Sequence, residues 1–151
     1  MDKLNFLKTE FPNLLKGLNP DAKGNWGVMN GQQMVEHMTD AFSWASDKHS
    51  LKLHTPIEQV GKYKEFAMSD KEFKPNTKNA LMAETAYPLR NTSMQNAIAE
   101  LEKEIECFIT YFENNKGAII TNPFFGDLNF EEQTHLLHKH AIHHCKQFGL
   151  L

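Results

Sequence analysis

A stripe of apolar residues at helical spacing constrains the fold of this chain more than any other feature of its sequence. The stripe consists of Ile98, Leu101, Ile105, Phe108, Ile109 and Phe112. Glu100 and Lys103 fall on the opposite side of the same helical wheel. A helix with one such apolar face must bury it against other elements. The pattern therefore predicts a long amphipathic helix that begins at a cap near Ser93.

Another helix is predicted from about Gly31 to Asp47, because Asn30 is suited to cap it. Gln33 completes a capping box, in which each side chain bonds the other residue's backbone N–H group. The apolar residues of this segment occupy more than one side of the wheel. We therefore expect this helix to be buried on several faces.

Two further helices are predicted at the ends of the chain. Residues 4–18 carry apolar residues at helical spacing, and Pro12 within them predicts a kink or two shorter pieces, because proline removes a backbone donor. Near the C-terminus, Asn129 and Glu132 have the spacing of another capping box. The helix that follows should end near Gly149, since glycine is a common stop.

Residues 51–92 show no clear periodicity and are interrupted by prolines, although the stretch IEQVGKYKEF is suited to a short helix. No alternating apolar and polar run is long enough to predict a strand. We therefore expect an all-α fold. We expect this fold to be a four-helix bundle in one domain over residues 1–151, with a long crossover connection between the second and third helices.

Composition excludes some functions. A net charge of −3 provides no general attraction for nucleic acid or for an anionic membrane. The two cysteines form no plausible disulfide framework, and no apolar run has the length of a membrane span. The expected compartment is the cytoplasm, with neither nucleic acid nor membrane as a partner.

Five of the eight histidines fall within ten residues near the C-terminus, HLLHKHAIHH. On a helical wheel, His140 and His144 share the face of the two leucines and should point inward. His135 and His138 fall on the opposite side and are expected to meet water. His143 lies at the edge of the inward face.

A third inward histidine comes from the second predicted helix. His37 shares a face with Ala41, which leaves space beside a ligand, and with Trp44, which would line an apolar wall. Asp40 lies at the edge of this face and is a candidate for proton transfer. Histidines four residues apart on one helix can bind one ion together, and a catalytic site commonly uses three protein ligands.

The same histidines also allow a reading without metal. A lone pair four residues apart is more often structural or exposed than metal-bound, and His37 alone fits a core histidine bonded to a carbonyl. An inward pair on one helix and a third inward histidine on another favour a metal site formed by His37, His140 and His144. His143 is then expected beside the ligands, as a residue that supports them.

Two stretches resemble a known family. GNWGVMNGQQMVEHMTDAF and NPFFGDLNFEEQTHLLHKHAIHHCKQFGL are similar to the DinB-like superfamily, in a branch with W-G-x-M and HxxHHxxQF motifs. The second motif corresponds here to His140, His143, His144, Gln147 and Phe148. The resemblance extends over essentially the whole chain and is weakest in residues 51–92.

This resemblance implies a four-helix bundle, commonly dimeric, with a divalent metal such as zinc, nickel or iron. The metal roles carry over to His37, His140 and His144, and Gln147 becomes a residue of the second shell or pocket. Relatives in the superfamily include thiol S-transferases and isomerases that use low-molecular-weight thiols, and others are described as metal-dependent hydrolases.

Three functions remain open. The first is a metal-dependent transferase that activates a thiol and presents its sulfur to a small-molecule electrophile. The second is a hydrolase that uses metal-bound hydroxide and a carboxylate such as Asp40. The third is a bundle that the ion only stabilises. We rank the transferase above the hydrolase.

We also expect a homodimer, because Ile142 and Cys145 form an apolar spot on the outer face of the last helix.

Overall fold

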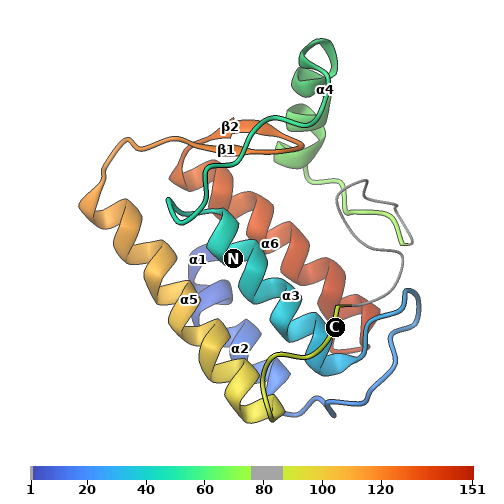
Figure 1. Ribbon diagram of the computed structural model, residues 1–151. Coiled ribbons are helices and arrows are strands. Elements are labelled where there is room, and N and C mark those ends of the chain that lie inside the picture. The colour runs from blue at the N-terminus through green and yellow to red at the C-terminus, as the bar shows by residue number, and fades with distance from the viewer. Residues whose placement is uncertain (1, 76–86) are drawn as a thin grey trace.

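The fold is mostly helical, in agreement with the all-α prediction (Figure 1). The structure, a computed structural model, describes residues 2–75 and 87–151. Its elements are α1 (Lys3–Asn5), the π-helical turn η1 (Phe6–Glu10), α2 (Phe11–Leu15), α3 (Gly31–Trp44), α4 (Ile57–Met68), α5 (Met94–Asn114), β1 (Ile120–Asn122), β2 (Gly126–Leu128) and α6 (Phe130–Gln147).

The interruption predicted at Pro12 takes the form of a widened turn. The backbone N–H of Phe11 bonds the carbonyl of Phe6, five residues back, so that η1 separates α1 from α2. Proline has no N–H, and its ring crowds the carbonyl four residues before it. A π-helical turn directly before Pro12 accommodates that ring without breaking the segment.

The helix starts predicted from the sequence are confirmed. Asn30 and Gln33 form a reciprocal capping box at α3, and Asn129 and Glu132 form another at α6. The Ser93 side chain accepts a hydrogen bond from a backbone N–H in the first turn of α5. The stop of α3 differs from the prediction, because the helix ends at Trp44, three residues before Asp47.

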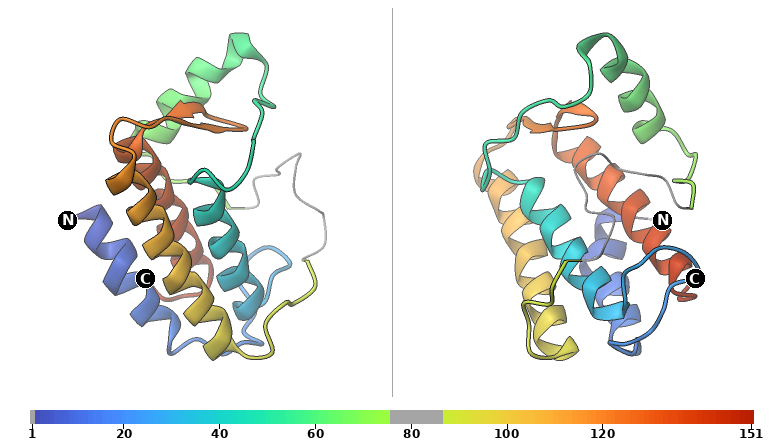
Figure 2. Two further views of the ribbon diagram at one scale, coloured as in Figure 1. Left: turned by 60° about the vertical axis from the view of Figure 1, so that its left-hand side comes forward. Right: turned by 45° about the vertical axis from the view of Figure 1, so that its right-hand side comes forward.

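The long helices and the N-terminal helical segment (α1, η1 and α2) run side by side around one core. Figure 2 shows α3 between α5 and α6, with the N-terminal segment on the other side of α5 and α6. The apolar stripe of α5 is buried, as its periodicity predicts. The core includes the fully buried side chains of Phe11, Met38, Phe42, Leu101 and Phe108.

The connection between α3 and α5 contains the predicted short helix, α4. It lies at one end of the helices, beside a hairpin formed by β1 and β2 (Figure 1). The prediction that no strand forms is wrong for this hairpin. Its strands are three residues long, in the register Ile120 opposite Leu128. Strands this short leave no alternating pattern in the sequence.

One face of α6 differs from its prediction. His135 and His138 were expected to meet water, but both are half-buried beneath the N-terminal segment. The His135 ring bonds the Lys3 ammonium through Nδ1 and the Ser69 carbonyl through Nε2. The His138 ring meets the Phe6 ring edge-on at 5.1 Å. The helical wheel separates these histidines from His140 correctly, but it cannot show that another helix covers them.

Cys145 is also covered. It was expected on the outer face of α6 with Ile142, but its side chain is fully buried, and burial raises the pKa of its thiol to about 12. Ile142 is half-buried and lies beside Phe6 and Leu14 of the N-terminal segment. The apolar spot therefore belongs largely to the fold of one chain. Among the residues that the structure describes, no helix has the length and apolar character needed to cross a membrane.

A buried lysine ties the connection to α6. The Lys139 ammonium donates to the carbonyls of Phe66 at 3.0 Å and Ser69 at 2.8 Å, and also to that of Lys71. It lies 4.7 Å from the centre of the Phe66 ring, a cation–π contact. Burial lowers the pKa of this lysine. The carbonyls at the end of α4 are thus satisfied by a side chain of α6.

Replacing Lys139 with Met should lower the free energy of unfolding by about 1–3 kcal/mol, because buried carbonyls lose their donor. Chemical denaturation measures this change. The matched control is Lys146→Met on the same helix, where an exposed ion pair with Glu72 is lost. That change should stay within about 0.5 kcal/mol. Equal stability of both variants would show that the Lys139 contacts contribute nothing.

Candidate metal centre

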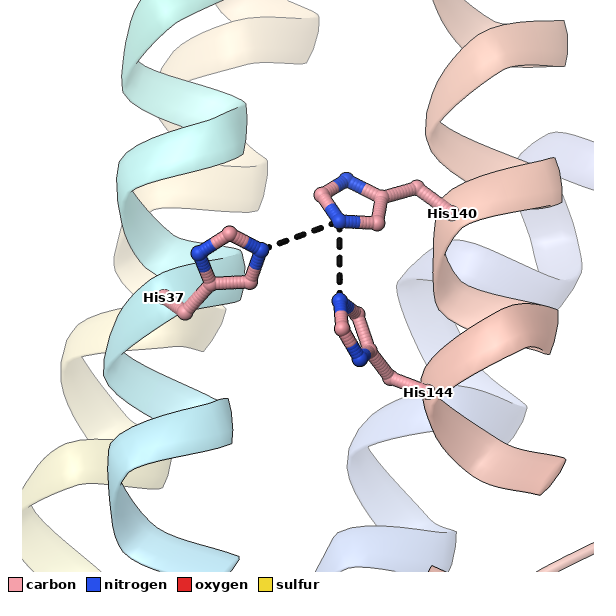
Figure 3. A group of neighbouring side chains, drawn as sticks. All are labelled: His37, His140 and His144. Carbon is pink, nitrogen blue, oxygen red and sulfur yellow. Dashed lines mark hydrogen bonds between the residues drawn. The ribbon is translucent and has the colours of Figure 1, made fainter. Parts of the chain in front are cut away.

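Three histidines from two helices meet between α3 and α6 (Figure 3). His37 lies in the middle of α3, and His140 and His144 lie one turn apart on α6. The Nε2 atom of His140 is 3.0 Å from that of His37 and 2.9 Å from that of His144. The three residues that the sequence selects as ligands are therefore brought together.

The spacing of the three nitrogen atoms suits one metal ion. Their candidate ligand atoms all lie within 4.8 Å of one another. A tetrahedral ion with metal–nitrogen distances of about 2.0–2.1 Å holds its ligand atoms about 3.3 Å apart. Within residues 2–75 and 87–151, no other group of three His, Cys, Asp or Glu side chains meets the same criterion.

Hydrogen bonds alone do not explain this arrangement. A ring nitrogen of neutral imidazole either donates one proton or offers one lone pair. The Nε2 atom of His140 faces two other Nε2 atoms at hydrogen-bond distance, so it cannot bond both of them well. A positive ion between the rings would satisfy all three nitrogens at once. The donor set therefore fits a divalent metal.

Burial keeps these imidazoles neutral. The pKa of His37 is lowered to about 4, chiefly by burial, and that of His144 is lowered to about 3, by burial first and by the charge of His37 second. Burial also holds the pKa of His140 well below its usual value. Neutral rings carry the lone pair that a metal needs, so the site is ready to bind at neutral pH.

Gln147 supports the ligands directly. Its Oε1 atom is 2.7 Å from Nδ1 of His144, and its Nε2 atom donates to the carbonyl of Trp26 at 2.8 Å. The side chain is 3% exposed. The position expected for Gln147, beside the ligands, is the one the structure shows.

His143 lies at the rim, as its wheel position predicts. Its ring is 5.3 Å from the Trp26 ring and 6.0 Å from the Phe73 ring. Burial lowers its pKa, and a hydrogen bond to the backbone of Phe73 acts in the opposite direction. Its ring centre lies 5.1 Å from that of His144, so it packs against a ligand.

Asp40 and Trp44 lie on α3 with His37, at different distances from it along the helix. Asp40 is one turn from His37, but its carboxylate pairs with the Arg90 guanidinium at 3.0 Å. Arg90 also bonds Glu100 at 2.7 Å. Trp44 is the last residue of α3, seven residues and about 10 Å along the axis from His37. Asp40 is therefore the closer of the two to the histidines along the helix.

Two neighbours of the site could not be read from the sequence. Phe73 lies 6.2 Å from His140, ring centre to ring centre, although it belongs to a segment without periodicity. Trp26 contributes a backbone carbonyl, which any residue type could supply. The W-G-x-M motif marks the position of Trp26 but does not indicate that its main chain is the part in contact.

The surroundings of the cluster differ on its two sides. In Figure 3, α5 lies behind α3 and the N-terminal segment lies behind α6. Phe73 of the connection approaches His140 and His143, and Trp26 also covers His143. A small molecule at the site would meet aromatic side chains from the connection and from the loop before α3.

Comparison with protein-family models, with curated proteins and with solved structures finds no match.

Without metal, the protein should lose stability as the pH falls from about 7 to about 4. An unfolded histidine titrates near about 6.5, whereas His37 in the fold has a pKa of about 4. The unfolded chain binds more protons in this interval, so the free energy of unfolding decreases as pH falls.

Denaturation in the presence of a chelator, repeated across this pH range, measures the effect. His37→Gln should flatten the dependence, while the control His49→Gln, which changes an exposed histidine, should leave it unchanged. An identical pH dependence in His37→Gln and in the unaltered chain would contradict the assignment of a depressed pKa to His37.

Proposed function

We propose that this chain is a metal-dependent enzyme of the DinB-like class, a four-helix bundle whose divalent ion is held by His37, His140 and His144. The observation that carries the proposal is the convergence of three neutral imidazole nitrogens from two helices within 4.8 Å. Three protein ligands leave a position for a substrate atom or water, which is the usual arrangement of a catalytic site.

When bound, the ion would act as a Lewis acid that lowers the pKa of a thiol or a water molecule. The residues of the chain supply the rest. Gln147 orients His144, and burial keeps the three rings neutral. Phe73 and Trp26 provide aromatic surface around His143, which would exclude water and contact an apolar part of a substrate.

Thiol transfer is the reaction that we favour. A hydrolase also needs a group that accepts a proton from water, and Asp40 is the carboxylate expected for it. Its ion pair with Arg90 engages that carboxylate. A low-molecular-weight thiol has less need of a proton acceptor in the protein, because its sulfur loses a proton more readily than water does. Hydrolysis is the second candidate, and the partly exposed Asp40 would be its proton acceptor.

A purely structural ion is the remaining alternative. It would be supported by a fourth protein ligand, since structural sites are usually closed. Among the described residues, the group that meets the ligand spacing has three members, all histidine. Three protein ligands favour an ion with one coordination position left open for substrate or water.

Replacing His37, His140 or His144 singly with Ala should remove most of the bound metal. Losing a ligand should weaken binding more than the roughly 10–100-fold that removal of an outer hydrogen-bond partner costs. Elemental analysis of tag-free protein, purified without a nickel column, measures the metal content. His135→Ala is the matched control, because His135 lies on α6 but bonds Lys3 and Ser69.

A full equivalent of metal in His37→Ala, together with loss in His135→Ala, would overturn the assignment of ligands. His143→Ala should give an intermediate result, since its ring packs against His144.

The reaction class can be tested with cobalt in place of the native ion. A thiol that binds through sulfur should add a sulfur-to-cobalt charge-transfer band to the absorption spectrum, and turnover of an electrophile should then depend on that thiol. Glutathione, cysteine and 2-mercaptoethanol are suitable probes. Hydrolysis of esters without any thiol, and no charge-transfer band with any of the three, would favour the hydrolase instead.

We also propose that the chain forms a homodimer, as the resemblance implies. The buried Cys145 removes one of the two residues that suggested an interface on α6, so the proposal now rests on the resemblance and on Ile142. Light scattering at micromolar concentration should give twice the mass of one chain. The mass of a single chain would contradict it.

A further inference from the structure

The amide group of Gln147 can have only one orientation. One of its atoms lies 2.8 Å from the carbonyl oxygen of Trp26, and that oxygen can only accept a hydrogen bond. The atom facing Trp26 must therefore be the NH₂ group, and the amide oxygen must face His144. Because the side chain is 3% exposed, water is not at hand to satisfy a reversed amide.

This orientation determines where His144 carries its proton. The amide oxygen of Gln147 is also only an acceptor, so Nδ1 of His144, 2.7 Å away, must bear a hydrogen. A neutral imidazole has one such hydrogen. The lone pair is then left on Nε2, the atom that faces His140 and the centre of the cluster. The ring is in the form that can bind a metal.

The loop that presents the Trp26 carbonyl is fitted closely to α6. The backbone N–H of Asn25 donates to the carbonyl of Gln147 at 2.7 Å. A Cβ atom at Gly24 would lie 2.9 Å from Cγ of Gln147, and one at Gly27 would lie 2.8 Å from its Nε2 atom. Gly27 also has a φ of +80°, which favours glycine. A side chain at either position would push the loop away from Gln147.

We infer that the loop of residues 24–27 is a positioning element for the metal centre, which acts through Gln147 to hold His144 in the Nδ1–H form. The inference rests on the proposed metal site and adds to it. A segment that supplies no ligand sets the proton position of a ligand on α6, and the two residues that bond, Trp26 and Gln147, are 121 positions apart in the chain. Fixing the tautomer and orientation of a ligand histidine in this way increases its affinity for metal.

The first test measures the tautomer directly in metal-free protein. Nitrogen-15 NMR of the imidazoles distinguishes Nδ1–H from Nε2–H, and His144 should be in the Nδ1–H form. Gln147→Met, which removes both hydrogen bonds but keeps the length of the side chain, should shift His144 toward a mixture of the two forms. An unaltered chain with His144 as Nε2–H would overturn the inference.

The second test measures zinc affinity by competition with a chelating dye. Gln147→Met should bind zinc about 10–100-fold more weakly than the unaltered chain. Gly27→Ala should weaken binding in the same direction, although residue 27 does not touch the metal ligands. The matched control is Gly117→Ala, because Gly117 has the same φ of +80° but nothing within 4 Å of an added Cβ. It should introduce the same backbone strain without a clash and leave the zinc affinity unchanged.

The two tests separate the inference from the proposed function. Equal zinc affinities in Gly27→Ala and Gly117→Ala would overturn the role of the loop while leaving the three-histidine site in place. If the unaltered chain binds no zinc or other divalent ion, the proposed function fails, and the tautomer of His144 alone then decides whether the loop positions that ring.

Discussion

Three imidazoles lie in or at the edge of the space between α3 and α6, with His144 buried and His37 and His140 half-buried. Burial disfavours their charged forms, so His37 and His144 stay neutral at pH values where an exposed histidine would be protonated. The Nε2 atom of His140 faces two other Nε2 atoms and can form a good hydrogen bond with only one of them, so one contact between neutral rings is left unsatisfied. A divalent ion resolves both problems, since it binds the lone pairs and replaces the missing partners. Burial of the three rings is therefore unfavourable without an ion, but it keeps them in the neutral form that binds a metal.

Elements far apart in the sequence hold this cluster in place. The core helices α3 and α6 bring the ligands together, while α5 and the N-terminal segment lie behind these two helices (Figure 3). Lys139 secures the end of α4 to α6, and the chain that follows places Phe73 beside His140. The loop before α3 reaches Gln147 with its backbone. Lys139 and Gln147 each donate to a backbone carbonyl that would otherwise lack this donor, so the same hydrogen bonds satisfy the backbone and position the site.

The ligands could be predicted from the sequence because they depend on local periodicity. One turn separates His140 from His144, and the leucines beside them show which side of α6 faces inward. The caps of α3 and α6 were equally readable, since each is a bond between residues three apart. Packing between segments that are distant in the sequence could not be predicted in this way. The N-terminal segment that packs on His138 lies more than a hundred residues earlier, and no pattern within α6 predicts that contact or the full burial of Cys145. The hairpin and the position of Phe73 could not be predicted either, because three-residue strands and an irregular connection have no periodicity.

We propose that three imidazoles and no other protein side chain bind one ion. X-ray absorption at the zinc edge of the tag-free, zinc-loaded chain tests it most directly, because multiple scattering counts imidazole ligands and the first shell separates sulfur from nitrogen and oxygen. We expect three imidazoles with zinc–nitrogen distances of about 2.0–2.1 Å and a further light atom that is not histidine. A sulfur ligand near about 2.3 Å, or fewer than three imidazoles, would contradict it.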